Sequence, residues 1–170
     1  MKPLEDIRRE YLKNGLSLEQ LNSNPIAQFE QWLNLALEAN MLGDPTAMTL
    51  STVDTKGCPS ARVVLLKKIV QENLIFFTNL TSQKAKQIEH NPNVCLHFAW
   101  LPLERQVIIH GQAKKLSTAE NTQYFLSRPR DSQLAAWASN QSQPITSRAA
   151  LDDLFKQMKQ RFEDKTIPLP

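Results

Sequence analysis

Glycine and cysteine are both scarce in this chain, which has four glycines and two cysteines among 170 residues. So few glycines exclude a glycine-rich phosphate loop, and neither a Walker loop nor a GxGxxG motif occurs, which excludes the dinucleotide-binding folds that need them. The two cysteines, Cys58 and Cys95, form no CxxC pair and show no metal-ligand spacing. We therefore expect two unpaired thiols, as is usual in the reducing cytoplasm.

Long apolar segments and a strong excess of one charge are missing too. No apolar run approaches the roughly 20 residues that span a bilayer, and the charged N-terminus has no secretory apolar segment. The net charge is only +3, which permits a nucleic-acid partner without requiring one, and the basic residues are not interleaved with aromatic ones. We expect a cytoplasmic protein that binds neither a membrane nor a nucleic acid.

Motifs for metal-dependent or nucleophilic catalysis are also absent. His90, His97 and His110 form no HExxH motif and no arrangement with paired carboxylates, and there is no GxSxG. These histidines are therefore expected in the core or on the surface, and no metal site is expected.

Helical periodicity is found at both ends of the chain. We predict a short helix over residues 4–14 and a second helix capped by Asn24. Four apolar residues of the second helix recur at helical spacing and are expected to face the core: Ile26, Phe29, Leu33 and Leu37. Near the C-terminus further helices are expected within 117–128, 131–139 and 147–164, before an extended, proline-containing tail.

The middle of the chain is typical of β-strands instead. Runs rich in Val, Ile, Thr and Phe are separated by turn residues and lie at 46–53, 60–69, 73–79, 94–100 and 105–116. The turns at 54–57 and 71–73 are short enough for antiparallel hairpins, and one helix, ending at Asn91-Pro92, interrupts the strands. The pattern predicts a single α+β domain, a small antiparallel barrel with helices outside it.

The helix that follows strand 73–79 begins near Thr81 or Ser82 and has Lys84 in its first turn. A helix N-terminus offers unpaired N–H groups and the positive end of the helix dipole, so these residues could bind an anion. An ordinary capped surface helix would have the same sequence.

The strand at 60–69 carries a cation at each end. In an extended strand Arg62 and Lys67 point to opposite faces, so the strand could serve two binding regions. Lysines also protect sheet edges against aggregation, so the pattern alone does not decide.

The stretch YFLSRPRDSQ (124–133) is harder to explain without a ligand. Arg128 and Arg130 flank a proline beside an expected helix start, and Tyr124 lies one helical turn before Arg128. Such a set suits a phosphate dianion, because arginine donates paired, charge-assisted hydrogen bonds. The alternative is a surface ion pair of Asp131 with one arginine, worth at most about 1 kcal/mol.

A set of short motifs goes further than these physical arguments. They are RREY (8–11), DPTAM (44–48), RVVLLK (62–67), FFTN (76–79), KAKQIE (84–89), LERQV (103–107), SRPRDSQ (127–133) and QS (141–142). In order and spacing the set resembles the pyridoxine/pyridoxamine 5'-phosphate oxidase family over essentially the whole chain.

The resemblance implies an FMN-binding split β-barrel, antiparallel and Greek-key-like with peripheral helices, that works as a homodimer with FMN at the subunit interface. It implies oxidation of pyridoxamine or pyridoxine 5'-phosphate to pyridoxal 5'-phosphate, a step of vitamin B6 metabolism, with O2 reduced to H2O2. A hydride would leave the C4' carbon of the substrate for the flavin, so the cofactor supplies the chemistry and the protein supplies orientation and charge.

Site residues follow from the same resemblance. The residues expected to contact FMN are Arg62, Val63, Val64, Leu65, Leu66, Lys67, Phe77, Thr78 and Lys84, with Gln106, Gln141 and Ser142 reaching it from the partner subunit. Those expected to contact the substrate are Lys67, Tyr124, Arg128 and Ser132, which hold its phosphate, and Arg8, Arg9, Glu10 and Tyr11 within an N-terminal lid over residues 1–20. Arg130 is expected to support the loop.

Two departures from the family pattern stand out. Gln83 occupies a position where the family usually has an arginine, which predicts weaker FMN binding unless Lys86 or a backbone amide substitutes. The family also continues beyond the PLP at 168–170 with strands that carry a tryptophan and an Arg-x-His-x-Arg cluster. The sequence thus leaves two main hypotheses: an oxidase of B6 phosphates, or a truncated, catalytically impaired homodimer that binds FMN or pyridoxal phosphate. A nucleic-acid binder ranks far below both.

Overall fold

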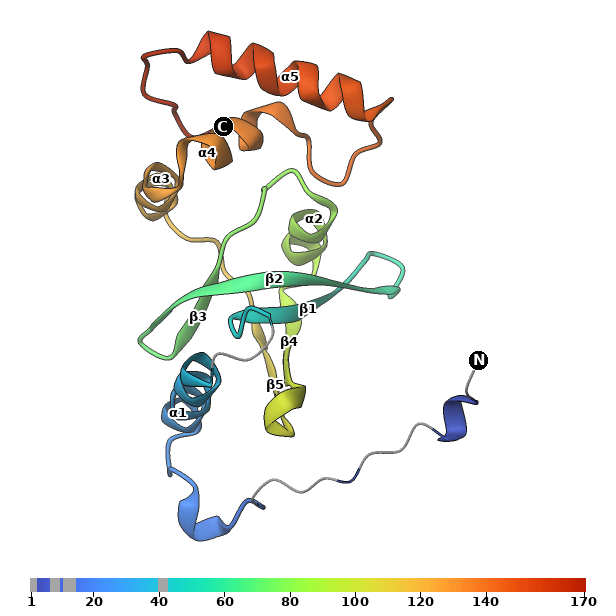
Figure 1. Cartoon of the computed structure of the whole chain (residues 1–170), viewed down its shortest axis with the longest axis vertical. Coiled ribbons are helices and arrows are strands. Elements are labelled where there is room, and N and C mark those ends of the chain that lie inside the picture. The colour runs from blue at the N-terminus through green and yellow to red at the C-terminus, as the bar shows by residue number, and fades with distance from the viewer. Residues whose placement is uncertain (1–2, 7–9, 11–14, 40–42) are drawn as a thin grey trace. The chain divides into compact units, whose positions relative to one another are not determined.

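The computed structural model describes residues 3–6, 10, 15–39 and 43–170 (Figure 1). By their contacts these residues form two compact units. The first unit comprises the described residues of Met1–Leu50 together with Arg62–Phe77 and Cys95–Ile109, and the second comprises Ser51–Ala61, Thr78–Val94 and His110–Pro170. Several strands begin in one unit and end in the other.

The five predicted strands are all present and form one sheet in the order β3-β2-β1-β4-β5. Their bounds are Ala47–Val53 (β1), Pro59–Val70 (β2), Asn73–Phe76 (β3), Asn93–Trp100 (β4) and Arg105–Gln112 (β5). Both predicted hairpins are confirmed. In the first, Asp54 Oδ1 accepts hydrogen bonds from the N–H groups of Lys56 and Cys58, which fixes the turn between β1 and β2. In the second, β2 pairs antiparallel with β3, and Val70 is opposite Asn73.

The first unit is built around α1, Pro25–Glu38. As predicted, Asn24 caps this helix, because its side-chain oxygen accepts from the N–H groups of Ile26 and Ala27. Phe29 is buried and contacts Phe98 and Trp100 of β4, with ring centroids 4.8 and 5.8 Å away. The predicted apolar stripe is wrong at one position: Leu37 is 48% exposed, and the small Ala36 is buried in its place.

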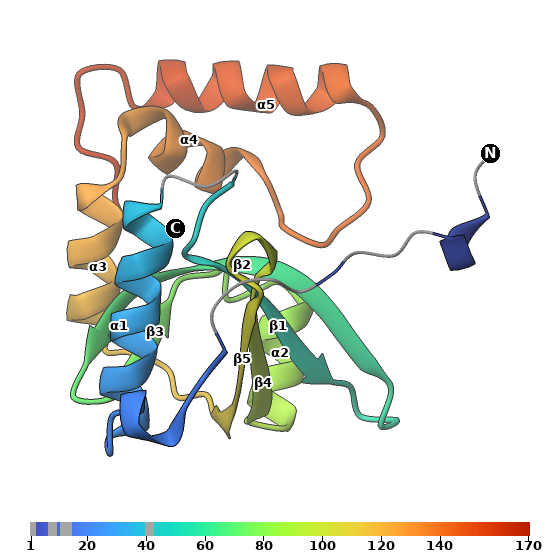
Figure 2. The same cartoon turned by 60° about the horizontal axis from the view of Figure 1, so that its bottom comes forward.

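The second unit contains four helices: α2 (Gln83–His90), α3 (Thr118–Ser127), α4 (Arg130–Ala138) and α5 (Arg148–Arg161). Figure 2 shows α4 and α5 packed side by side. The predicted helix within 117–128 is confirmed as α3, and it begins with a capping box in which Ser117 and Glu120 bind each other's backbone N–H. A core of Phe125, Leu134, Phe162 and Ile167 joins these helices to the tail.

The tail after α5 is extended, as predicted, and it is held in place by α4. Arg130 donates hydrogen bonds to the carbonyls of Phe162 and Lys165, and the Trp137 indole donates to the carbonyl of Pro168 at 2.9 Å. Ile167 is buried between these anchors. Arg130 therefore supports the tail after α5, whereas its expected support of the loop beside Arg128 stays a prediction.

The predicted helix over residues 4–14 does not form as one element in the described residues. A 3-10 turn covers Leu4–Asp6, and Glu10 is irregular. A second short turn, Leu18–Gln20, precedes α1. Leu4–Asp6 and Glu10 are exposed, and an isolated helix of this length is marginal without a packed face.

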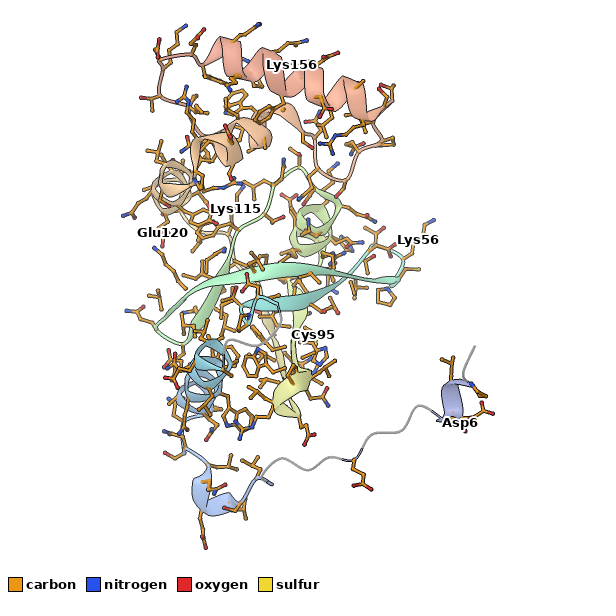
Figure 3. All side chains as sticks on the ribbon, in the orientation of Figure 1. Asp6, Lys56, Cys95, Lys115, Glu120 and Lys156 are labelled. Carbon is orange, nitrogen blue, oxygen red and sulfur yellow. The ribbon has the colours of Figure 1, made fainter. Side chains whose placement is uncertain are left out.

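Both cysteines are free, as predicted: Cys58 is exposed, and Cys95 is half-buried on β4 (Figure 3). No helix within the described residues is long and apolar enough to cross a membrane. In the same residues, His, Cys, Asp and Glu side chains form no group of three or more that could hold a metal ion.

Candidate functional site

Strand β2 carries the run Arg62 to Lys67 in the first unit. Arg62 Nη1 donates to the carbonyl of Leu50 at 3.0 Å, and burial lowers the pKa of the Arg62 guanidinium. An arginine stays protonated despite such a shift. Along the strand Val63 is exposed, Val64 and Leu65 are half-buried and Leu66 is buried. β2 therefore places a fixed cation at the start of this run.

The other end of the run is a β-bulge that the sequence analysis did not predict. Leu66 pairs with Phe76, and Lys68 pairs with Ile75, the residue just before Phe76. Two steps along β2 therefore correspond to one step along β3, and Lys67 is the extra residue of the bulge. A bulge redirects side chains from the regular alternation of a strand. Lys67 is exposed, beside a cavity of about 340 Å³ that Lys68 and Thr46 also line.

A turn before β1 stabilises this end of β2. Asp44 Oδ1 accepts hydrogen bonds from the hydroxyl of Thr46 at 2.7 Å and from its backbone N–H at 2.9 Å. These two hydrogen bonds, with a smaller contribution from Lys67, lower the pKa of Asp44. The Thr46 carbonyl in turn accepts from the Leu66 N–H at 2.9 Å. The DPT sequence thus fixes the backbone next to the bulge.

In the second unit an ammonium and several hydrogen-bonding side chains gather at the N-terminus of α2. Ser82 caps the helix through the Ala85 N–H. Lys84 is only 8% exposed, and its ammonium donates to Gln141 Oε1 at 2.8 Å and to Ser82 Oγ at 3.5 Å. The Thr78 hydroxyl donates to the same Gln141 oxygen at 3.2 Å. The structure therefore brings together three of the residues predicted for the cofactor: Thr78, Lys84 and Gln141.

Three residues of this region were singled out from the sequence: Gln141, Ser142 and Gln83. Gln141 was expected to come from a partner subunit, yet it contacts Thr78 and Lys84 of its own chain. Ser142, beside it, has a φ of 68°, a left-handed conformation. Gln83 occupies the first position of α2. Gln83 and Lys86 of this helix are both exposed.

Three of the predicted substrate residues, Tyr124, Arg128 and Ser132, lie where α3 ends and α4 begins. Tyr124 is half-buried in the last turns of α3, Arg128 follows the helix as its half-buried C-cap, and Ser132 is in the first turn of α4. Gln133 Nε2 donates to the carbonyl of Arg128 at 2.8 Å, which fixes the backbone between the two helices. α4 begins at Arg130, one residue before the predicted range 131–139.

Gln106 lies on β5 in the first unit and is exposed. Its Oε1 atom is 3.1 Å from His97 Nε2 on β4. If the imidazole is the donor, this contact directs the amide NH2 of Gln106 outward. The contact of His97 with Gln106 was not predicted, because the pairing of adjacent strands carries no local signal in the sequence. Phe77, also predicted for the cofactor, is half-buried just after β3, whereas Arg8, Arg9 and Tyr11 lie outside the described residues and Glu10 is exposed.

Comparison with known proteins identifies the family. The model of the pyridoxamine 5'-phosphate oxidase family matches residues 37–162, well over half of the chain. The chain belongs to this family. A pyridoxine/pyridoxamine 5'-phosphate oxidase of Hahella chejuensis is 56% identical over 167 residues, which cover 98% of this chain and 79% of that protein. A protein of the same name from Teredinibacter turnerae is 58% identical with the same coverage.

Solved structures confirm the predicted fold class, an α+β split barrel. PhzG from Burkholderia lata 383, solved with tetrahydrophenazine-1-carboxylic acid, matches with a TM-score of 0.85 and 26% identity over 93% of this chain and 78% of its own. A pyridoxamine 5'-phosphate oxidase-related, FMN-binding protein from Nostoc punctiforme matches with a TM-score of 0.60 and 17% identity, over 78% of this chain and 73% of its own. The second likeness concerns the fold alone.

The residues present fit the FMN that the family implies. A phosphate monoester needs cationic and hydroxyl donors, and the start of α2 supplies a buried ammonium, the Thr78 hydroxyl and first-turn N–H groups. Gln141 and Ser82 add an amide and a second hydroxyl next to the ammonium. This oxidase-family chain therefore has the donor set that a flavin phosphate requires.

Proposed function

We propose that this chain is an FMN-dependent oxidase that converts pyridoxamine or pyridoxine 5'-phosphate to pyridoxal 5'-phosphate and reduces O2 to H2O2. The observation that carries the proposal is the buried Lys84 ammonium at the α2 N-terminus, within a chain 53–58% identical to relatives of that name. Burying an ammonium is unfavourable unless hydrogen bonds or an anion compensate it. Gln141 and Ser82 supply neutral acceptors here, and a phosphate at the helix start would be a charged acceptor for the same ammonium.

The flavin phosphate is assigned to Lys84, Thr78, Gln141 and Ser142, and the flavin itself to Phe77, Gln106 and the β2 run from Arg62 to Lys67. When bound, FMN would supply the two-electron chemistry by accepting a hydride from the substrate carbon. The Arg62 guanidinium, held by the Leu50 carbonyl, keeps its charge in one place. The chain's own part is to bind, to orient and to provide fixed positive charge.

The substrate phosphate is assigned to Arg128, Tyr124, Ser132 and Lys67. Arg128 is held by Gln133 on its carbonyl, and the first turn of α4 presents backbone N–H groups beside it. Arginine is suited to this task because its planar guanidinium donates two parallel hydrogen bonds to phosphate oxygens. This assignment favours a phosphorylated vitamer over an unphosphorylated carboxylic acid such as the compound bound to PhzG.

We further propose that the two units act as one flavin-binding domain, that the protein works as a homodimer, and that it acts in the cytoplasm. Gln106 is exposed on β5, so it can face a second copy of the chain, and the two free cysteines suit a reducing compartment. Contacts of Arg8, Arg9, Glu10 and Tyr11 with the substrate stay a prediction.

The test compares two variants on purified protein. Arg128→Ala should raise KM for pyridoxamine 5'-phosphate about 10- to 100-fold and leave the FMN dissociation constant unchanged, because it removes charge-assisted hydrogen bonds to the substrate alone. Lys84→Ala should weaken FMN binding by a similar factor. Arg148→Ala, at an 84% exposed side chain, is the matched control and should change neither.

Flavin absorption is measured first, then pyridoxal 5'-phosphate and H2O2 formation. Colourless protein that does not take up FMN would refute the proposal. FMN-bound protein that forms no H2O2 from either phosphorylated vitamer would refute the oxidase and leave a binding protein. Equal losses of FMN and substrate affinity in Arg128→Ala would refute the assignment of the two phosphates.

A further inference from the structure

Helix α2 buries polar side chains where a surface helix normally buries apolar ones. Its two buried residues are Lys84 and Gln87, 8% and 5% exposed, and its cap Ser82 is fully buried. Lys84 and Gln87 are three residues apart and so lie on the same face of the helix. Because buried polar groups are unfavourable unless satisfied, this face needs an explanation beyond packing.

Gln87 is satisfied by side chains of two strands. The Thr52 hydroxyl of β1 donates to Gln87 Oε1 at 2.5 Å, and Gln87 Nε2 donates to Ser60 Oγ of β2 at 3.3 Å. Thr52 is fully buried, and all of these residues belong to the second unit. Within the described part of the chain, no buried side-chain nitrogen or oxygen lacks a partner.

This network constrains α2 more tightly than apolar contacts would. Apolar contacts have no preferred donor or acceptor direction, whereas an amide that donates to one hydroxyl and accepts from another is fixed in direction. Since Lys84 precedes Gln87 by one turn, fixing Gln87 also fixes the direction of the Lys84 stem. Lys84 Nζ then reaches Gln141 and Ser82.

We propose that Gln87, with Thr52 and Ser60, is a positioning network that aims Lys84 and the α2 N-terminus at the phosphate of the bound flavin. Gln87 acts through Lys84 and touches no ligand itself. The inference rests on the proposed FMN site. It adds Thr52 and Ser60, which lie outside the sequence motifs, and it gives a role to Gln87, a residue of the KAKQIE motif for which none was expected.

The test uses a pair of variants that separates the effect of the Thr52 hydroxyl from the effect of the side-chain volume. Thr52→Val removes the hydroxyl and keeps the volume, whereas Thr52→Ser keeps the hydroxyl. Dissociation constants for FMN and for riboflavin, which lacks the phosphate, are measured by flavin fluorescence at a temperature where every variant is folded. Thr52→Val should raise the FMN dissociation constant about three- to tenfold and leave that of riboflavin unchanged, as expected for one hydrogen bond that supports the phosphate site. Thr52→Ser should bind FMN like the wild type.

Gln87→Leu is the second variant and should show the same selective loss if it folds. Gln28→Leu is the matched control, because Gln28 is also buried, at 7% exposure, but its side chain binds Asn22 and Gln31, in and just before α1. It should lower the melting temperature and leave both dissociation constants unchanged.

Three results would overturn the inference. They are an unchanged FMN affinity in Thr52→Val, an equal loss of FMN and riboflavin affinity in Thr52→Val, or a Thr52→Ser protein that binds FMN more weakly than the wild type. A wild-type protein that binds riboflavin as tightly as FMN would instead refute the proposed phosphate site itself. The two proposals therefore fail in distinguishable ways.

Discussion

Asp44 shows how one side chain couples the local backbone to pH. Its carboxylate accepts from both the hydroxyl and the N–H of Thr46, and these hydrogen bonds hold the pKa of Asp44 below its ordinary value of 3.8. They favour the ionised form in the folded protein, and the unfolded chain lacks them. A carboxylate with a lowered folded pKa stabilises the protein above its unfolded pKa, and this contribution disappears as pH falls through the folded value.

We therefore expect Asp44→Asn to destabilise the protein at pH 7 and to make no difference near pH 2. The amide oxygen of Asn still accepts from Thr46, so the loss should stay below about 1 kcal/mol, as is usual for an exposed charge. Urea denaturation of the wild type and of Asp44→Asn between pH 7 and pH 2 measures this loss as a difference in the free energy of unfolding. Thr46→Val removes the hydroxyl donor. The difference in unfolding free energy between the wild type and this variant should show part of the same pH dependence. A difference between wild type and Asp44→Asn that is equally large at pH 7 and pH 2 would contradict this account.

Residues whose partners lie close in sequence could be predicted from the sequence, and residues with distant partners could not. Asn24, Ser82 and Ser117 each cap the helix that follows them, because the capping hydroxyl or amide reaches only two or three residues ahead. By contrast, Gln87 finds Thr52 at a sequence separation of 35, and Lys84 finds Gln141 at 57. No periodicity or spacing indicates such contacts, since only the folded chain brings these residues together.

At the scale of elements, the turn between β2 and β3 is short and strained. Gln71 and Glu72 have φ values of 48° and 64°, the left-handed region that most side chains avoid. Such values at both central residues are those of a type I′ hairpin turn, which prefers Asn-Gly. Two contacts compensate the strain: Asn24 Nδ2 donates to Glu72 Oε1 at 2.8 Å, and Asn73 Nδ2 donates to the carbonyl of Gln71 at 2.9 Å.

We predict that Gln71→Asn stabilises the protein by about 0.5 kcal/mol, because asparagine adopts positive φ more readily than glutamine. Glu72→Gly should gain less than its conformation alone suggests, because it also removes the acceptor for Asn24. Urea denaturation at pH 7 gives both free energies. A destabilised Gln71→Asn would show that the turn geometry does not limit stability here.

The element pattern of the chain was mostly predictable, and its irregularities were not. Strand β2 was expected at 60–69 and is found at Pro59–Val70, because alternation and β-branched residues mark a strand directly. The bulge at Lys67 escaped notice because it depends on the register with β3, which contributes one residue fewer. The strand expected at 73–79 ends at Phe76, since the chain there begins the loop that leads to the α2 N-terminus.

At the scale of the whole molecule, one exposed face of β5 matters for the proposed homodimer. Gln106, Ile108 and His110 alternate outward along this strand, and Ile108 is 55% exposed. On β2 of the same unit Val63 is 67% exposed. Exposed branched residues on a sheet face suit burial against a second copy, and Gln106 would then reach the flavin of the partner.

We expect the wild-type protein to sediment at twice the 19.4 kDa of one chain. Ile108→Asp should sediment as a monomer, because dimerisation would bury an unpaired carboxylate, and it should bind FMN at least tenfold more weakly, because Gln106 of the partner would be lost. Leu154→Asp, which adds the same charge at a 38% exposed position of α5, is the control and should remain dimeric. Analytical ultracentrifugation with and without FMN measures both effects. If Ile108→Asp stays dimeric and keeps its FMN, β5 is not the interface, and Gln106 must contact the flavin from its own chain or not at all.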